Sequence, residues 1–264
     1  MEILRFDLCG KFAHFRKYYA NNTALSYTLP PRTAVMGMLA ALLGRPRDSY
    51  YREFSSANLR IGLRILAPIK KTFHRVNHLK VESAADFRGG RSDKHTQTPF
   101  EVVTGLDLRT DFVRYRVYLA SIGSENGDAV FGEVKGILSL RKGVYPVSLG
   151  TANFTAQVQD FRVFTKGGWS ELPAPADFLP LHSAILSERV LAIDIDNNSK
   201  LMAEEELMPA DFVDDYNREL SRMHRLFFAI DSQPMPLKIN GTFFELHSPN
   251  ASGANETENI VFLD

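Results

Sequence analysis

The segment from Ala34 to Leu43 constrains the fold more than any other part of the chain, because it is almost wholly apolar. Pro30-Pro31 stands before it and Gly44 after it, which is the arrangement that brackets a helix. A helix that is apolar on every side must be buried on most of its sides. Other elements must therefore enclose this helix, and a chain of 264 residues is long enough to supply them.

Alternating apolar residues predict strands over 3–8, 60–66 and 112–119. In the first of these strands every second side chain is apolar, so we expect a strand with one buried face. In the third strand the apolar residues alternate with two arginines. We expect Arg114 and Arg116 to point outward, away from the core.

A second helix is predicted over 128–140, because its apolar side chains recur on one side. A last strand of the same domain is expected near 145–149 or 154–164. The order strand, helix, strand, strand, helix, strand is the ferredoxin-like pattern. We therefore expect an α+β protein with a ferredoxin-like domain over residues 1–165.

The remaining residues, 166–264, predict a β-rich C-terminal extension that packs on the same core. Within it, the segment 238–243 predicts a hairpin with a tight Asn-Gly turn. Residues 249–259 predict a flexible loop ahead of a short final strand over 260–263.

The formal net charge of zero conceals an uneven distribution. Residues 1–120 hold 20 Lys and Arg against 10 Asp and Glu, while residues 121–264 hold 11 against 21. A basic half in a neutral chain is what a polyanion-binding face on one side would produce. Pairing of opposite charges between the two halves would explain the same counts, and charge alone leaves both readings open.

A stretch of interleaved cations and aromatic rings, Lys11 to Tyr19, directly follows the first predicted strand. Cations neutralise phosphates, and Phe and Tyr rings stack on unpaired bases. This composition favours single-stranded RNA as a ligand. The alternative is a strand with a buried Phe12 and a charged surface.

A long polar insertion separates the second and third predicted strands, over roughly 70–98. It holds seven Lys and Arg against three Asp and Glu, and Gly89-Gly90 would let the backbone approach a phosphate closely. Its length exceeds that of a simple connection, so we expect a functional segment or an extended hairpin. A disordered, solvated loop is the alternative.

Familiar catalytic motifs are missing from the sequence: there is no phosphate-binding or dinucleotide-binding glycine loop, no HExxH and no GxSxG. Cys9 is the only cysteine, which excludes an intramolecular disulfide and a Cys-rich zinc site. The Asp194-Ile195-Asp196 pair suits an exposed strand end better than a metal site, and Glu204-Glu205-Glu206 predicts a solvated face. We expect no catalytic residue, no metal and no cofactor.

Charged residues near the N-terminus interrupt any apolar run there, so no export signal is expected. No stretch approaches about 18 uninterrupted apolar residues, so no membrane span is expected either. These features predict a cytoplasmic protein that does not contact a membrane.

The sequence blocks Gly10–Lys17 and Leu25–Gly44 resemble the opening of the CRISPR-associated (Cas) family five proteins. The blocks Thr98–Val103 and Tyr145–Thr151 are similar to two later blocks of that family and occur in the same order. The resemblance covers roughly the first 160 residues. It implies a RAMP-superfamily protein with a ferredoxin-like (RRM-like) domain and a protruding thumb, here the insertion at about 70–98.

The resemblance also implies a role. The family caps one end of the type I Cascade backbone, holds the 5′ handle of the CRISPR RNA, and contacts the large subunit and the adjoining backbone subunit. The entry to the apolar helix, from Ser26 to Thr33, looks most like the type I-B branch. Some type I-C relatives cleave precursor RNA through Tyr, Lys and His, but no such triad aligns on defined positions of this chain, so catalysis is not carried over.

We therefore predict a non-catalytic CRISPR RNA-binding subunit of a Cascade ribonucleoprotein complex in antiviral defence. Target DNA near the PAM is a further partner that the sequence leaves open. One alternative is a metal-independent endoribonuclease that uses His14, Tyr18 or His95 as acid or base, and another is a protein-only scaffold. The residues predicted to contact RNA are Lys11, His14, Arg16, Lys17, Tyr18, Tyr27, Arg32, Lys71, Arg75, Arg88, Arg91, Lys94, His95 and Gln97.

Overall fold

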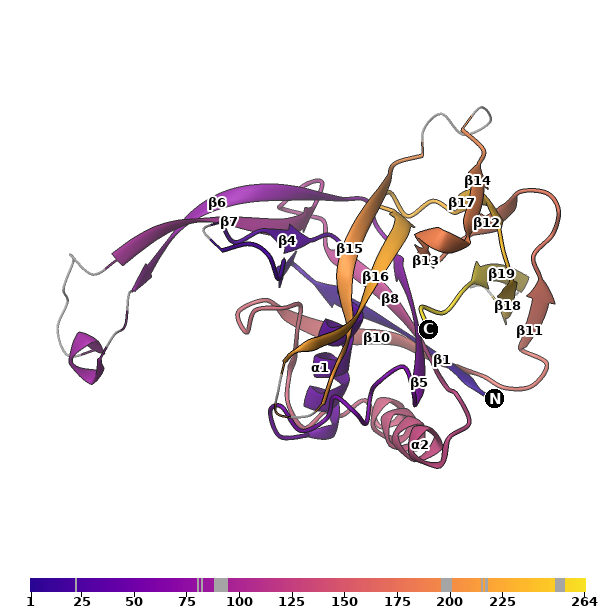
Figure 1. Ribbon diagram of the computed structural model, residues 1–264, viewed down its shortest axis with the longest axis horizontal. Coiled ribbons are helices and arrows are strands. Elements are labelled where there is room, and N and C mark those ends of the chain that lie inside the picture. The colour runs from indigo at the N-terminus through magenta and orange to yellow at the C-terminus, as the bar shows by residue number, and fades with distance from the viewer. Residues whose placement is uncertain are drawn as a thin grey trace.

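A five-stranded antiparallel sheet and two helices form the N-terminal domain in the computed structural model (Figure 1). The structure describes residues 1–21, 23–79, 81, 83–87, 95–195, 201–214, 216, 218–249 and 255–264. The elements of this domain are β1 (Ile3–Gly10), α1 (Arg32–Leu43), β5 (Leu59–Ile65), β8 (Val113–Ser121), α2 (Glu125–Ser139), β9 (Val147–Ser148) and β10 (Thr155–Phe164).

The order of these elements along the chain and across the sheet is ferredoxin-like, so the predicted fold class is confirmed. The strands lie in the order β5-β8-β1-β10-β9, with β1 antiparallel to both β8 and β10. The predicted strands and helices are found within a few residues of their expected bounds. The second helix starts early, at Glu125, because the side chain of Ser124 accepts a hydrogen bond from the Gly127 backbone and caps it.

The two helices cover one face of the sheet (Figure 1). Leu4, Phe6 and Leu8 of β1 lie in the same buried cluster as Met36 and Leu39 of α1. The helix ends where its sequence indicated, because Gly44 adopts a left-handed φ of 72° and its backbone N–H turns back to the last carbonyls.

The opposite face of the sheet is also buried, so the expectation of one buried face for β1 is wrong. Ile3 of β1 and Tyr118 of β8 pack against Phe244 and Ile260, which lie in the C-terminal extension. The alternating pattern failed here because a face covered by another part of the chain can be lined with polar side chains that bind one another.

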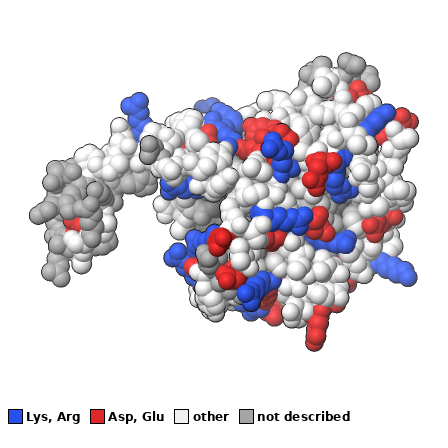
Figure 2. Space-filling model, viewed as in Figure 1, with Lys and Arg blue, Asp and Glu red and all other residues white. Residues whose placement is uncertain are grey.

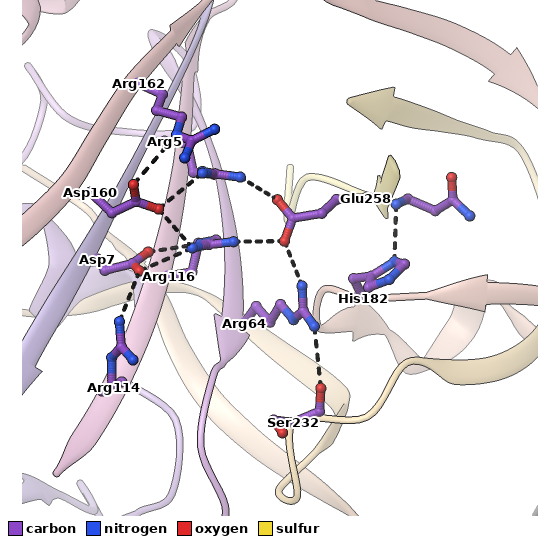
Figure 3. A network of polar contacts seen from close by, with 11 residues as sticks. Arg5, Asp7, Arg64, Arg114, Arg116, Asp160, Arg162, His182, Ser232 and Glu258 are labelled. Atoms are coloured by element: carbon purple, nitrogen blue, oxygen red, sulfur yellow. Dashed lines mark hydrogen bonds and ion pairs between the residues drawn. The ribbon is translucent and has the colours of Figure 1, made fainter. Parts of the chain in front are cut away.

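Those polar side chains form an ion-pair network (Figure 3). Glu258, with 2% of its side chain exposed, binds the guanidinium groups of Arg5, Arg64 and Arg116. Arg116 also binds Asp7 at 2.7 Å, so its predicted outward orientation is wrong. Burial alone would raise the pKa of Glu258, but the three arginines outweigh it and lower that pKa to about 2.

The C-terminal extension is β-rich, as expected, and its strands form three small sheets: β11-β18-β19, β12-β17-β14 and β13-β16-β15. Its residues join the same core, since Met208 and Phe228 lie in the cluster beneath the central sheet. Its elements are β11 (Trp169–Pro173), β12 (Leu179–Leu181), β13 (Ile185–Leu186), the 3₁₀ turn Ser187–Arg189, β14 (Val190–Ile193), β15 (Ala203–Phe212), β16 (Leu220–Ala229), β17 (Met235–Ile239), β18 (Thr242–Pro249) and β19 (Asn255–Ile260).

Two local predictions in the extension are wrong. Asn240-Gly241 forms a turn, with a φ of 89° at Gly241, but the flanking strands β17 and β18 belong to different sheets and make no hairpin. The final strand is β19, which pairs with β18 inside the range predicted as a loop, whereas residues 250–254 of that range lie outside the described residues. In both cases long-range pairing decided the structure and local composition did not.

The insertion forms a long antiparallel hairpin that projects from the domain (Figure 1). Its legs, β6 (Ile69–Leu79) and β7 (His95–Gly105), pair from Ile69↔Gly105 to Leu79↔His95. A 3₁₀ turn, Ala84–Phe87, lies between them. The extended hairpin expected for this insertion is therefore confirmed for the legs, where the backbone groups that face each other pair across the ladder.

Three short strands lie beside the root of this hairpin. Phe12–Ala13 (β2) pairs with β7, and Phe15–Arg16 (β3) pairs with Ser26–Tyr27 (β4). The cation–aromatic stretch that follows β1 is thereby placed at the base of the hairpin.

We predict that Leu39→Asp abolishes soluble folding. Leu39 is fully buried, and an unpaired buried carboxylate costs several kcal/mol against a total stability of about 5–15 kcal/mol. Soluble yield and thermal melting measure the effect, with Ala129→Asp at an exposed position of α2 as the control. Wild-type melting of Leu39→Asp would contradict the placement of α1 beneath the sheet.

We predict that Glu258 makes the protein sensitive to acid. Its native pKa lies below its ordinary value of 4.5, so its stabilising effect is complete above pH 4.5 and is lost as the pH falls toward about 2. The whole effect is about 3 kcal/mol of unfolding free energy. Chemical denaturation should show that the unfolding free energy falls as the pH is lowered through this range. Glu258→Gln should remove this dependence on pH, whereas Glu256→Gln, at an exposed position of the same strand, should retain it. An unchanged dependence in Glu258→Gln would contradict the assignment.

Candidate nucleic-acid interface

A groove with a volume of about 1150 Å³ lies at the root of the hairpin. Four of its walls come from places that are distant in the sequence. They are the β3 region with His14 and Arg16, the hairpin leg from Thr96 to Phe100, one side of α1, and the loop from Pro146 to Ala152. The groove thus collects the sequence blocks that resemble a known family.

His14 holds the first wall to the hairpin. Its Nδ1 lies 2.7 Å from the carbonyl oxygen of Glu101, and its ring stacks on Phe100 with ring centres 4.0 Å apart. Burial, assisted by the nearby Arg16 charge, lowers the pKa of His14. The ring is therefore neutral at pH 7, and because a carbonyl only accepts, the proton is on Nδ1.

The carboxylate of Glu101 continues this attachment. It accepts a hydrogen bond from the backbone N–H of Ser26 at 2.7 Å, and the backbone N–H of Glu101 donates to Ala24. One residue of the hairpin therefore fixes both β4 and the His14 ring. The root of the hairpin is built as a rigid wall of the groove.

The loop wall depends on Gly150. Its φ is 95°, and an added Cβ would lie 1.7 Å from the carbonyl oxygen of His14. The backbone N–H of His14 donates to Leu149 at 2.9 Å. Only glycine lets this loop lie so close to the strand, which explains a glycine in the Tyr145–Thr151 block.

The cation–aromatic stretch divides on folding. Arg16 is exposed at the groove and donates to the carbonyl of Ala20, while Tyr18 and Tyr19 are 53% and 55% exposed beside it. Lys11 lies elsewhere, over the ring of Phe112 near the other face of the sheet. Of the cations in this stretch, Arg16 is the one that lines the groove.

Lys17 and Lys71 are neutralised within the protein. The carboxylate of Glu206, in β15, binds Lys17 Nζ at 2.8 Å and Lys71 Nζ at 3.1 Å, and it accepts the backbone N–H of Thr28 at 3.0 Å. Only 8% of the Glu206 side chain is exposed, and Glu204 binds the Thr28 hydroxyl. The prediction of a solvated face is therefore wrong for Glu204 and Glu206, because they meet cations of the N-terminal half.

Tyr27 and Arg32 are core residues, each 1% exposed, so neither presents a surface to RNA in this structure. The guanidinium of Arg32 binds Asp211 at 2.6 Å and the carbonyl oxygens of Phe54 and Leu59. It ties the start of α1 to the extension. A charged residue at a helix start gave no signal of burial, since its partner lies far away in the sequence.

The hairpin carries exposed polar side chains along its legs. Arg75, His95 and Gln97 are exposed, and Gln97 also lines the groove. The predicted RNA contacts Arg88, Arg91 and Lys94 lie outside the described residues, as does Gly89-Gly90.

Sequence reasoning missed the far wall of the groove. Tyr50, Tyr51 and Arg218 lie there, and Arg218 donates to Asp48 at 2.8 Å and to the hydroxyl of Tyr51 at 3.1 Å. The hydrogen bonds from Tyr51 and Arg218 lower the pKa of Asp48. Paired tyrosines were a weak signal in the sequence, and Arg218 reaches the groove from the extension.

Charges of both signs are mixed over the face of the molecule that Figure 2 shows. Among the described residues no group of three His, Cys, Asp or Glu side chains could hold a metal ion, and Asp196 of the Asp-Ile-Asp pair is not described. No helix within the described ranges is both long and apolar enough to span a membrane.

The chain thus consists of a ferredoxin-like domain with a projecting hairpin, a groove at the root of that hairpin and a β-rich extension. A family model described as CRISPR-associated protein (Cas_Cas5) matches residues 3–172. The chain therefore belongs to this Cas5 family of CRISPR-associated proteins, which confirms the family resemblance seen in the sequence.

A solved structure shares the fold. The chain is similar to a CRISPR protein from Archaeoglobus fulgidus, at 13% sequence identity and a TM-score of 0.55, with 99% of each chain covered. It is also similar to a chain of a CRISPR RNA-guided surveillance complex, at 16% identity and a TM-score of 0.47, covering 88% of this chain and 91% of that one. A comparison with curated proteins gives no match.

We predict that Glu206→Ala destabilises the protein by about 2–3 kcal/mol, because it leaves two partly buried ammonium groups and a backbone N–H without their acceptor. The matched control is Glu205→Ala on the other side of β15. Its side chain is 46% exposed and pairs with Arg225 at 3.7 Å, which is worth less than about 1 kcal/mol. Equal midpoints of denaturation for the two variants would contradict the stabilising role given to the contacts of Glu206.

Proposed function

We propose that this chain is a CRISPR RNA-binding subunit of a Cascade-type effector complex and that it caps the 5′ handle of the guide. The observation that carries the proposal is the groove at the hairpin root, where the opening block, Thr98–Val103 and Tyr145–Thr151 of a Cas5 family chain come together. An RNA end needs a groove of this kind, with rigid walls and polar groups on several sides.

The chemistry of the groove suits unpaired RNA more than a duplex backbone. Arg16 supplies a charge for a phosphate, and Thr96, Gln97 and Thr98 supply neutral donors and acceptors for bases and ribose hydroxyls. The partly exposed ring of Phe100 adds an apolar surface. Recognition by such a lining depends on base edges and sugar as well as charge.

We further propose that the subunit is not an enzyme. The imidazole in the groove, His14, has Nδ1 tied to a carbonyl and a lowered pKa, which makes it a poor general acid at neutral pH. Burial raises the pKa of Tyr50, so its phenol stays protonated at neutral pH and cannot act there as a general base. Intact precursor RNA after incubation with the purified chain in EDTA would support this; cleavage would support a metal-independent endoribonuclease instead.

The proposed partners are those that membership of the Cas5 family implies. The hairpin would reach the adjoining backbone subunit, and other surfaces would meet the large subunit and target DNA near the PAM. The complex is proposed to be of type I-B in the cytoplasm. Affinity purification of the tagged chain from its host, with sequencing of the RNA and identification of the proteins that accompany it, tests these assignments together.

We predict that Arg16→Glu weakens RNA binding and flattens its salt dependence. Removing one phosphate interaction with single-stranded RNA reduces the slope of log K against log salt by about 0.7. Filter binding across a salt series measures both quantities. The control is Arg141→Glu, whose exposed side chain follows α2 and does not line the groove. An unchanged slope in Arg16→Glu would show that the RNA lies elsewhere. Lys17 is unsuitable for this test, because its reversal would repel Glu206.

A further inference from the structure

The C-terminal extension leaves one end of the second sheet face uncovered. Glu258 reaches Arg116, which lies in register with Asp7 on β1. The next row outward runs across three strands, with Cys9 of β1 opposite Arg114 on one side and Gln157 on the other. A groove of about 690 Å³ begins at this row and also includes Lys11, Phe112 and Gln159.

This groove lies beside an excess of positive charge. In the network behind it, five arginines share three carboxylates, those of Asp7, Asp160 and Glu258 (Figure 3).

Arg114 is the member of the network that faces the groove. It approaches Asp7 only to 3.7 Å, because Arg116 already binds both oxygens of that carboxylate at 2.7 and 3.0 Å. Its side chain is 44% exposed, and its buried Nε has no hydrogen-bond partner among the described residues. The exposed part of this guanidinium can therefore bind an anion from outside the protein.

The other groups of the groove suit a nucleotide. The ring of Phe112 is 49% exposed, and Lys11 Nζ lies 4.8 Å from its centre. Gln157 and Gln159 are exposed on β10, where Gln159 donates to the Gln157 side-chain oxygen and leaves amide groups for a further partner. An exposed ring between cations and amides can stack a base, bind its edge and neutralise its phosphate.

We propose that this groove binds one unpaired nucleotide of a nucleic-acid strand, with the base on Phe112, its edge on the glutamine amides, and its phosphate on Arg114 and Lys11. The site is separate from the groove of the proposed function, because Arg16 and His14 line that groove and do not line this one. An acidic protein segment could pair with the cations, but its carboxylates would not stack on the Phe112 ring or account for the glutamine amides beside it.

The test compares Phe112→Ala and Arg114→Gln with the wild-type chain in binding short oligouridylate and oligothymidylate. The matched control is Phe178→Ala. Phe178 is 38% exposed and lies under Lys238 Nζ at 4.9 Å, which is the same pair of groups in a different part of the surface. We expect Phe112→Ala to lower affinity about 5- to 100-fold and Arg114→Gln to reduce the salt slope by about 0.7. Phe178→Ala should change neither quantity.

Several outcomes would overturn the proposal. One is undetectable binding of both oligonucleotides by the wild-type chain. Another is an equal loss of affinity in Phe112→Ala and Phe178→Ala. The third is that the groove variants lose affinity for polyglutamate alone, which would assign the groove to an acidic protein. A preference between the two oligonucleotides tells whether RNA or DNA is the source. Arg16→Glu separates the two grooves: if it has no effect while Phe112→Ala does, the proposed capping groove fails and this site stands. Thermal melting confirms that each variant is folded.

Discussion

The carboxylate of Glu258, bound by three arginines from β1, β5 and β8, determines which surfaces of this molecule remain available. It sits over the sheet face opposite the helices, where an RRM-like domain would otherwise be open. Covering a face of charged side chains requires a counter-charge from the covering segment, because unpaired buried charges are costly. With that face closed, grooves are left at the hairpin root and at the uncovered end of the sheet.

Similar pairs connect the two halves of the chain at other points. Lys17 and Lys71 meet Glu206, and Arg32 meets Asp211. The basic first half and the acidic second half thus neutralise each other across an internal boundary. A count of basic residues overstates the charge that reaches a ligand, and the pairing of charges between halves, which the composition left open, accounts for a substantial part of the asymmetry.

The sequence was most informative where burial is local and periodic. Nearly every residue of 34–43 is apolar, and this run predicted the buried helix. Every second residue of 60–66 is apolar, and this alternation predicted a strand. It was least informative where partners are distant: nothing near Glu206 or Arg116 indicates that each would be buried by a charge more than a hundred residues away. The same limit hid the Tyr50–Arg218 wall of the groove, while the blocks that line its other walls were noticed through family likeness.

The hairpin has one mechanical property that follows from where it is held. Its contacts with the rest of the chain, through Thr104, Glu101, Pro99 and Lys71, lie at its root. Beyond the contact at Pro99, the pairs from Val76↔Thr98 to Leu79↔His95 extend about 13 Å further at roughly 3.3 Å per residue. Because the hairpin is held at one end, a tilt of about 10° at its root would move the end of these pairs by about 2 Å. Small shifts where Glu206 binds Lys71 would therefore produce larger shifts at the outer end of the paired legs, far from the charges that cause them.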